Sequence, residues 1–208
     1  MNLKQLREAC RHRLAEVSGT FFTDPMLTRW LNDALMEFAT ETKLIQRRKE
    51  TDVLPEIKPP LYPMDPDFFQ VNVLRVGDRT LKVASPYAIE ARAWETGDPT
   101  HYALVGQHIL LWPQPIRQET MVCWYYARPE EMVRDDDVPE IPEVYHHRLV
   151  VGACYIALMA DREFAGADRM KAEWEQAKAE AKRMFIEQTE QSAVVEDRAG
   201  YGFYLERW

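Results

Sequence analysis

The sequence predicts an α+β protein: a helical bundle from N- and C-terminal helices, with an inserted small antiparallel β domain and an extended C-terminal tail. Apolar residues recur at helical spacing towards both ends of the chain. Ten prolines between residues 51 and 129 exclude long helices from the middle. We therefore expect helices over residues 1–50 and a β-rich domain over residues 51–128. An acidic loop with two further helices should follow over residues 129–191, and then the tail over residues 192–208.

Two helices are expected in the first part of the chain. The apolar stripe of the first runs from Leu3 to Val17 at steps of three and four residues. Asp24 is placed to cap the second helix, and Pro25 suits its first turn. We expect this second helix to run to about Arg47, since the basic run at residues 47–49 would suit the negative end of a helix dipole.

The middle of the chain has the pattern of short strands joined by tight turns. Four β-rich runs lie between the prolines, namely Phe69–Val76, Tyr102–Val105, His108–Trp112 and Met121–Tyr126. Glycine begins the dipeptides at residues 77–78 and 106–107, where hairpin turns are expected. One helix should interrupt the strands, capped by Ser85, beginning at Pro86 and ending near Trp94. These runs predict a small antiparallel sheet or barrel.

An acidic loop opens the third part. Its acidic residues, among which Arg134 is the one basic residue, are Glu130, Glu131, Asp135, Asp136, Asp137, Glu140 and Glu143. The first five are the candidate functional residues. A solvated loop is the default interpretation, and a negative surface facing a channel or a partner is the functional one. Helices are then expected from Pro142 and over Ala165–Gln191. Small residues at positions 152, 153, 177 and 181 would let these two helices approach closely.

The tail is rich in large apolar side chains. These are Tyr201, Phe203, Tyr204, Leu205 and Trp208. Because solvated disordered tails are poor in aromatic residues, we expect this segment to dock on its own subunit or on a partner. The five residues are the predicted partner-binding residues.

The charge and the apolar runs exclude some functions. The chain has a formal net charge of -8, whereas a protein that grips DNA by its phosphates shows a basic surface. The longest uncharged apolar run, Leu149–Ala160, has 12 residues and is shorter than the roughly 20 that cross a bilayer. No secretory signal is visible at the start. We expect neither specific DNA binding nor membrane insertion.

No catalytic constellation is apparent. The short motifs of zinc proteases, α/β-hydrolases, P-loop proteins and dinucleotide-binding proteins do not occur. His146 and His147 are adjacent, so on a helix they point about 100° apart and cannot share one metal well. Three cysteines lie far apart without metal-binding spacing, which indicates core residues in a reducing compartment: Cys10, Cys123 and Cys154. We predict no catalytic residue, no cofactor and no metal.

Three stretches together resemble the head-to-tail adaptor, or connector, proteins of tailed bacteriophages. They are FTDPMLTRWLNDALMEFATET at residues 22–42, GDPTHYALVGQHILLWPQP at residues 97–115, and YYARPEEMVRDDDVPEIPEVYHHRLVVGACYIALMA at residues 125–160. Their order and spacing match that family: a helix with tryptophan and asparagine, a strand ending in Trp-Pro-x-Pro, and an acidic, proline-containing loop before a helix.

The resemblance implies a structural role in the virion. It implies a ring, commonly of twelve subunits, beneath the portal protein, which joins the DNA-filled head to tail or nozzle proteins. DNA passes through such a ring during packaging and ejection without specific binding. Assembly is expected in the host cytoplasm. In such relatives the C-terminal segment reaches the portal or a neighbouring subunit, and the matching segment here is Tyr201–Trp208.

Two other functions remain open from the sequence. The chain could be a cell-wall hydrolase of the same particle, with Glu140 or Glu143 as its acid. It could instead be a protein-binding module that uses the aromatic tail. A hydrolase requires a carboxyl group of perturbed pKa in a cleft, and a binding module requires a soluble partner and forms no ring.

Overall fold

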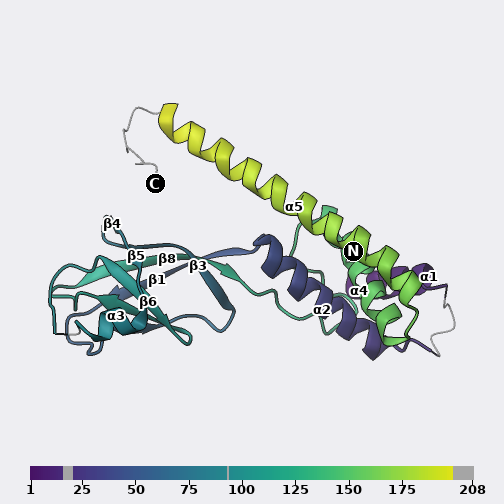
Figure 1. Ribbon diagram of the computed structural model, residues 1–208, viewed down its shortest axis with the longest axis horizontal. Coiled ribbons are helices and arrows are strands. Elements are labelled where there is room, and N and C mark those ends of the chain that lie inside the picture. The colour runs from purple at the N-terminus through teal and green to yellow at the C-terminus, as the bar shows by residue number, and fades with distance from the viewer. Residues whose placement is uncertain (16–20, 93, 199–208) are drawn as a thin grey trace. The chain divides into compact units, whose positions relative to one another are not determined.

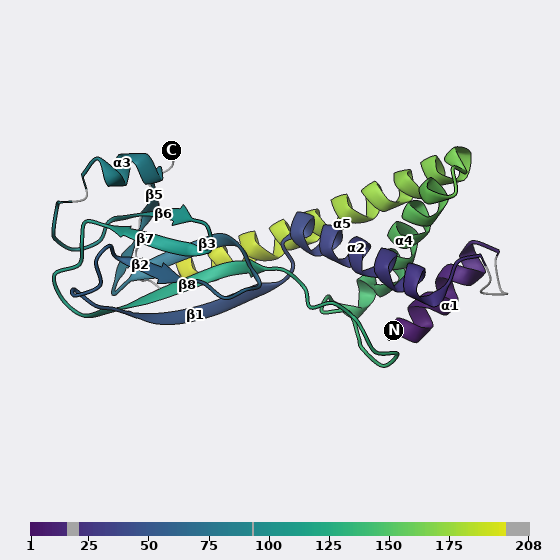
Figure 2. The same cartoon turned by 90° about the horizontal axis from the view of Figure 1, so that it is seen from below.

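The protein is an α+β protein with two compact units, seen in the computed structural model of Figures 1 and 2. The structure describes residues 1–15, 21–92 and 94–198, with side chains as far as residue 185. Residues 1–44 and 131–208 form the first, or helical, unit, and residues 45–130 form the second, or β, unit. The predicted end of the first helix near Val17 is wrong: the helix ends at Arg13, and Ala15 adopts a left-handed conformation with φ of 53°. The predicted tail residues from Tyr201 to Trp208 lie outside the described residues.

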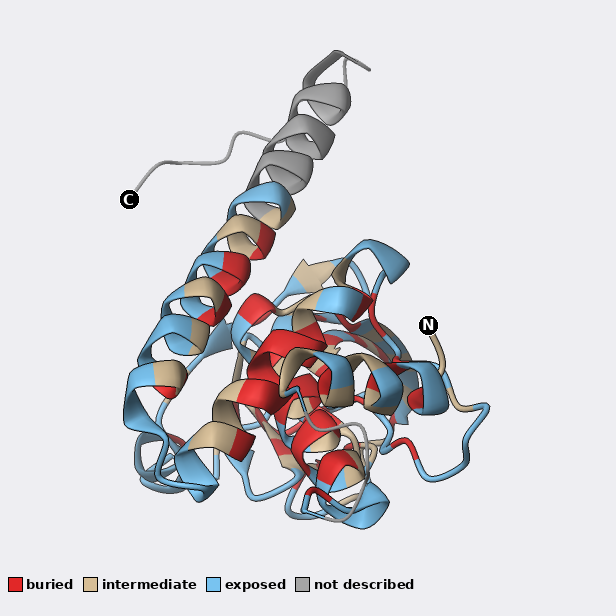
Figure 3. Ribbon diagram, turned by 90° about the vertical axis from the view of Figure 1, so that its right-hand side faces the viewer, coloured by how far each residue is buried: buried red, intermediate tan, exposed pale blue. Residues whose placement is uncertain are grey.

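The helical unit is built around one central helix. Its elements are α1 (Leu3–Arg13), α2 (Asp24–Thr42), the 3₁₀ turn η1 (Glu143–Tyr145), α4 (His146–Ala160) and α5 (Phe164–Arg198). Helix α4 packs against α1, α2 and α5, and residues 149–154 are all buried. Figure 3 shows the buried residues of α5 along the side that faces the other helices. A continuous apolar run therefore became a central helix, as its length predicted.

A glycine allows the close approach at the centre of this unit. A Cβ atom added to Gly152 in α4 would lie 3.0 Å from the Cβ of Ala34 in α2 and 3.0 Å from the ring of Trp174 in α5. Real Cβ atoms seldom come so near a neighbour, so position 152 has room for hydrogen alone. The small residue predicted at the contact between α4 and α5 is thus confirmed, and it serves α2 as well.

The predicted bounds of α2 were wrong at both ends. Its N-cap is Thr23, and Asp24 is instead the first helical residue, where its carboxylate accepts a hydrogen bond from Arg11 at 2.5 Å. The helix ends at Thr42 because Lys43 adopts a left-handed conformation with φ of 57°. The basic run at residues 47–49, expected at the helix end, lies in the first strand of the β unit.

Helix α5 is longer than the sequence pattern predicted. It continues to Arg198, beyond the expected end at Gln191, so residues 192–198 are helical and not an extended tail. The stretch from Thr189 to Arg198 contains neither proline nor glycine, so nothing in it interrupts a helix.

The β unit contains two four-stranded sheets, drawn as two layers in Figure 2. The first has the order β1 (Gln46–Val53), β8 (Glu119–Ala127), β3 (Phe68–Val76), β4 (Arg79–Thr80) and is antiparallel. The second has the order β2 (Leu61–Pro63), β7 (His108–Trp112), β6 (His101–Val105), β5 (Lys82–Val83). The named strands pair antiparallel, as expected, except at one edge of the second sheet, where β5 and β6 pair in parallel.

The turns and the interrupting helix lie where the sequence placed them. Gly77 and Gly106 have φ values of 57° and 59° and occupy the first loop position of two-residue hairpins. Glycine adopts this left-handed conformation without a steric cost. Ser85 caps α3 (Pro86–Glu90) by accepting a hydrogen bond from the Ala88 amide, although the helix ends four residues before the predicted Trp94.

Candidate functional site

The acidic segment is held against α1 and α2 as a strap, a name used here for residues 131–141. The side-chain amide of Asn32 in α2 donates a hydrogen bond to the Met132 carbonyl oxygen at 2.9 Å. The side-chain oxygen of Asn32 accepts one from the Met132 amide, also at 2.9 Å. Met132 is buried. Asn32 therefore clamps both polar backbone groups of one residue, 100 positions along the chain.

Helix α1 holds the middle of the strap. At the start of a helix, the first backbone amides have no carbonyl acceptor within the helix. In α1, the amides of Leu3 and Lys4 instead donate to the carbonyl oxygens of Asp137 and Asp135, at 2.8 and 3.1 Å. The Arg7 guanidinium donates to the Asp135 carboxylate and to the Thr28 hydroxyl of α2. The strap is therefore fastened to both N-terminal helices.

A tight turn shapes the strap. The carboxylate of Asp137 accepts hydrogen bonds from the amides of Arg134 and Val133 at 2.8 and 2.7 Å. These backbone hydrogen bonds favour the ionised form and lower the pKa of Asp137 from its usual value. Asp137 thus organises its own loop, as aspartate does in many turns.

The five predicted acidic residues therefore divide into different roles. Asp135 and Asp137 bind within the helical unit. Glu131 and Asp136 are exposed on the strap. Glu130 belongs to the β unit, where it lines an open groove of about 620 Å³. A second open groove, of about 560 Å³, lies between the strap and the start of α2 and is lined in part by Arg7, Asp33 and Glu131.

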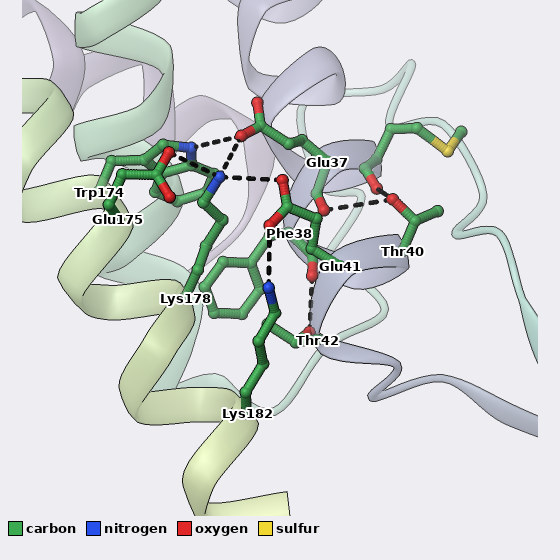
Figure 4. Close-up of polar contacts among 10 residues, drawn as sticks. Glu37, Phe38, Thr40, Glu41, Thr42, Trp174, Glu175, Lys178 and Lys182 are labelled. Carbon is green, nitrogen blue, oxygen red and sulfur yellow. Dashed lines mark hydrogen bonds and ion pairs between the residues drawn. The ribbon is translucent and has the colours of Figure 1, made fainter.

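A network of charges joins α5 to α2, as Figure 4 shows. Lys178 of α5 is buried and donates to Glu37 and Glu41 of α2 at 2.5 and 3.0 Å. It also pairs with Glu175 at 2.9 Å. The indole of Trp174 donates to Glu37 at 3.0 Å, so the ammonium and the indole share one carboxylate. This network fixes the register of α5 along α2.

Burial and charge oppose each other at this network. Burial alone would lower the pKa of Lys178, but its hydrogen bonds to Glu37, Glu175 and Glu41 raise it above its ordinary value. Burial likewise favours the neutral form of Glu41, yet hydrogen bonds from Lys178 and Lys182 hold its pKa below 4.5. Lys178 and Glu41 are therefore both held in their charged forms at neutral pH.

The β unit has a charge network of its own beside its groove. Arg47 and Lys49 of β1 pair with Asp67 at 2.5 Å and Asp65 at 2.7 Å. The buried hydroxyl of Tyr125 donates to Asp65 and Asp67 at 3.0 and 3.3 Å. Burial, followed by these two carboxylates, raises the pKa of Tyr125. The basic run of the sequence thus serves the folding of the β unit.

Several large apolar side chains of the β unit are exposed. The most exposed are Val83 at 70%, Tyr87 at 82%, Trp94 at 75% and Ile116 at 59%. On the first sheet, Trp124 is 42% exposed beneath the guanidinium of Arg48, which lies 5.7 Å from the ring centroid. Singly exposed apolar side chains are common on soluble proteins, so these residues do not by themselves identify a binding surface.

The described residues offer little for catalysis. They contain no cluster of three or more His, Cys, Asp or Glu side chains that could hold a metal ion. His146 is buried, and its Nε2 donates to the Ile141 carbonyl at 2.9 Å, while His147 is exposed on the helix. The side chain of Glu143 is 89% exposed, and neither groove is lined by it or by Glu140.

Within the described ranges, no helix is long and apolar enough to cross a membrane.

Sequence reasoning missed the residues that fasten the parts together. In the sequence, Asn32 is noticed only as part of the stretch at residues 22–42. Its hydrogen bonds to Met132 join that stretch to the one at residues 125–160. From the sequence alone, Lys178 can be paired only with a neighbour such as Glu175, three positions away on the same helix face. Its burial depends on Glu37 and Glu41, about 140 positions away, which no local pattern reveals.

Comparison with known proteins identifies a family for the chain. The family model of the SU10 adaptor protein matches residues 1–199, which includes all three stretches and both units. No curated protein matches the chain. The match spans nearly the whole sequence, so it covers the strap, the clamp at Asn32 and all of α5. The chain belongs to the SU10 adaptor family, a family of bacteriophage head–tail adaptors, and is thus a structural component of a phage particle.

Proposed function

We propose that the chain is one subunit of a closed ring that sits beneath the portal, joins the DNA-filled head to the tail and lines the DNA channel. The observation that carries this proposal is the match of the adaptor family over residues 1–199. The resemblance favours twelve copies. Its partners would be the portal protein, neighbouring copies of itself, and tail or nozzle proteins. Assembly would take place in the host cytoplasm.

The surface charges are compatible with a conduit for DNA. The formal net charge of the chain is -8, and a wall that neutralised phosphates would bind DNA through counterion release. DNA is then expected to slide past without specific contacts. We propose that the exposed strap carboxylates, Glu131 and Asp136, face the channel or a basic partner. The exposed carboxylate of Glu130, in the β unit, is proposed to face the channel or a basic partner too.

The long helix supports a role for the tail in docking. Helix α5 makes a described contact at Met184, whose sulfur accepts a hydrogen bond from Tyr145, and continues to Arg198. Those 14 residues add about 20 Å of helix. We propose that Tyr201, Phe203, Tyr204, Leu205 and Trp208 bind the portal or a neighbouring subunit, with aromatic rings as the main anchors.

The proposal can be tested on portal-bearing heads. Heads made without this chain are mixed with the purified chain and imaged by electron microscopy. The proposal predicts a ring of density at the portal vertex alone. Binding scattered over the capsid, or none while the chain is folded, would contradict it.

The tail is tested separately. A variant that lacks residues 199–208 should remain folded, because α5 and its bonds to α2 are intact. The same variant should lose its binding to heads, because the proposed docking residues are missing. The matched control replaces Tyr201, Phe203, Tyr204, Leu205 and Trp208 with serine at full length. Equal binding by the truncated and wild-type chains would refute the tail assignment and leave the adaptor role untouched.

The hydrolase alternative gains no support from the described residues. The side chain of Glu143 is largely exposed, and neither Glu140 nor Glu143 lines either of the two grooves. Digestion of peptidoglycan by the wild-type chain, lost in Glu140→Gln or Glu143→Gln, would revive it.

A further inference from the structure

Two cysteines meet inside the helical unit. Cys10 of α1 and Cys154 of α4 are 144 positions apart in the sequence, and both are fully buried. The thiol of Cys154 lies 3.8 Å from the carbonyl oxygen of Cys10, to which it donates, and the two side chains also share a hydrogen bond. The third cysteine, Cys123, lies in the β unit. The two thiols therefore lie where α1 packs on α4.

The surroundings of this pair keep it protonated. The hydrogen bond with Cys154, and then burial, raise the pKa of the Cys10 thiol well above its ordinary value. A thiolate is the reactive form of cysteine, so the folded protein should oxidise slowly. In a reducing compartment both thiols would remain free.

We infer that Cys10 and Cys154 form a redox pair whose disulfide staples α1 to α4. In the step, the two thiols lose two protons and two electrons, and one sulfur–sulfur bond forms. A thiol-oxidising azo compound such as diamide takes up both protons and both electrons and becomes the hydrazine. Glutathione disulfide performs the same oxidation by exchange and leaves as two molecules of glutathione. The inference concerns the helical unit and is independent of the proposed ring.

The staple would act on more than one helix. Helix α1 holds the strap through the amides of Leu3 and Lys4 and through Arg7. Fixing α1 to α4 therefore also restricts opening of the strap. The disulfide would close a loop of more than a hundred residues, for which loss of entropy in the unfolded chain is large. The oxidised protein should resist denaturant and proteolysis at the strap better than the reduced protein.

The test compares the oxidised and reduced full-length protein. Purified protein is incubated with diamide, free thiols are blocked, and peptides are mapped by mass spectrometry without reduction. We expect one intramolecular crosslink, between the Cys10 and Cys154 peptides, with Cys123 free. Urea unfolding should then show a higher midpoint for the helical unit, returned to the original value by dithiothreitol. Protease cleavage within residues 131–141 should slow several-fold on oxidation.

Two variants control this experiment. Cys10→Ala should lose both the crosslink and the oxidant-dependent shift, whereas Cys123→Ala should retain both. Because the wild-type protein is compared with itself in two redox states, a variant that folds poorly does not decide the result. The inference is overturned if the thiols of folded or partly unfolded protein stay free under diamide. It is overturned equally if Cys10 pairs with Cys123, or if the Cys10–Cys154 disulfide lowers the unfolding midpoint.

Discussion

The helical unit and the β unit differ in how far along the chain their stabilising contacts reach. In the helical unit, Asn32 clamps a residue 100 positions away, and Lys178 binds Glu37 across 141 positions. In the β unit, the bonds of Tyr125 to Asp65 and of Arg79 to Glu119 span 60 and 40 positions. The helical unit therefore cannot be completed until the whole β unit has been synthesised, whereas the β unit contains its own partners.

The largest effect is expected at the crossing of α2, α4 and α5. In Gly152→Val, new side-chain atoms must enter space already occupied by Ala34 and Trp174. Overpacking of this kind costs about 3 kcal/mol of unfolding free energy. Hydrogen exchange should report the loss in the helical unit alone, with the β unit unchanged. Ala172→Val, at an exposed position of α5, is the control and should cost about 0.5 kcal/mol. Similar costs at both positions would disprove the close packing.

The next largest effect is expected at the clamp. Asn32→Ala leaves the amide and carbonyl of buried Met132 without their partner, which costs about 2 kcal/mol. Faster exchange of the Met132 amide is the direct readout. Asp33→Ala changes the neighbouring, half-exposed carboxylate and should cost under about 0.5 kcal/mol. If exchange at residue 132 is unchanged in Asn32→Ala, the strap is held by something else.

In the β unit, the expected effect is smaller and comes from the backbone. Gly77→Ala and Gly106→Ala each place a side chain at positive φ, which costs about 1 kcal/mol. A new Cβ meets nothing within 4 Å at position 106 and only an ordinary contact at 3.5 Å at position 77. Both variants should therefore lose similar amounts of stability, measured by urea unfolding of the β unit. A large difference between them would show that contacts, and not φ, decide the cost.

The smallest expected effect is a difference between the two units in the pH at which each begins to lose stability. Asp65 in the β unit has its pKa lowered from 3.8, mainly by Lys49, and Glu41 in the helical unit has its pKa lowered from 4.5. A carboxyl group with a lowered pKa adds stability above its unfolded pKa and loses that stability as pH falls through its folded pKa. The helical unit should therefore begin to weaken at a higher pH than the β unit. Hydrogen exchange of each unit between pH 5 and pH 3 would check the order, which Glu41→Gln should remove.

The sequence predicted those parts of the fold whose signal is local. Glycine at residues 77 and 106, the cap at Ser85 and the apolar face of α4 all lie as expected, because each depends on neighbours a few positions away. Strand β1 was missed because it is an edge strand in which Val53 is the one buried residue, so it has no alternating apolar pattern. Its charges looked instead like the end of the preceding helix.

The candidate site was harder to predict because its geometry is tertiary. The acidic strap was recognised by composition, but composition does not show that Asp135 and Asp137 accept hydrogen bonds within the helical unit. The clamp at Asn32 and the burial of Lys178 both require partners from the other end of the chain. The adaptor role was predicted from the resemblance to a family, because the sequence contains no catalytic motif that would indicate a function.

Complementation of tailless heads would test the adaptor role most directly. DNA-filled heads from an infection that lacks this chain are incubated with the purified protein, then with separately purified tails, and infectious particles are counted. If the chain is the adaptor, the wild-type chain should restore infectivity and the chain without residues 199–208 should not. Heads that join tails equally well without the chain would contradict the adaptor role.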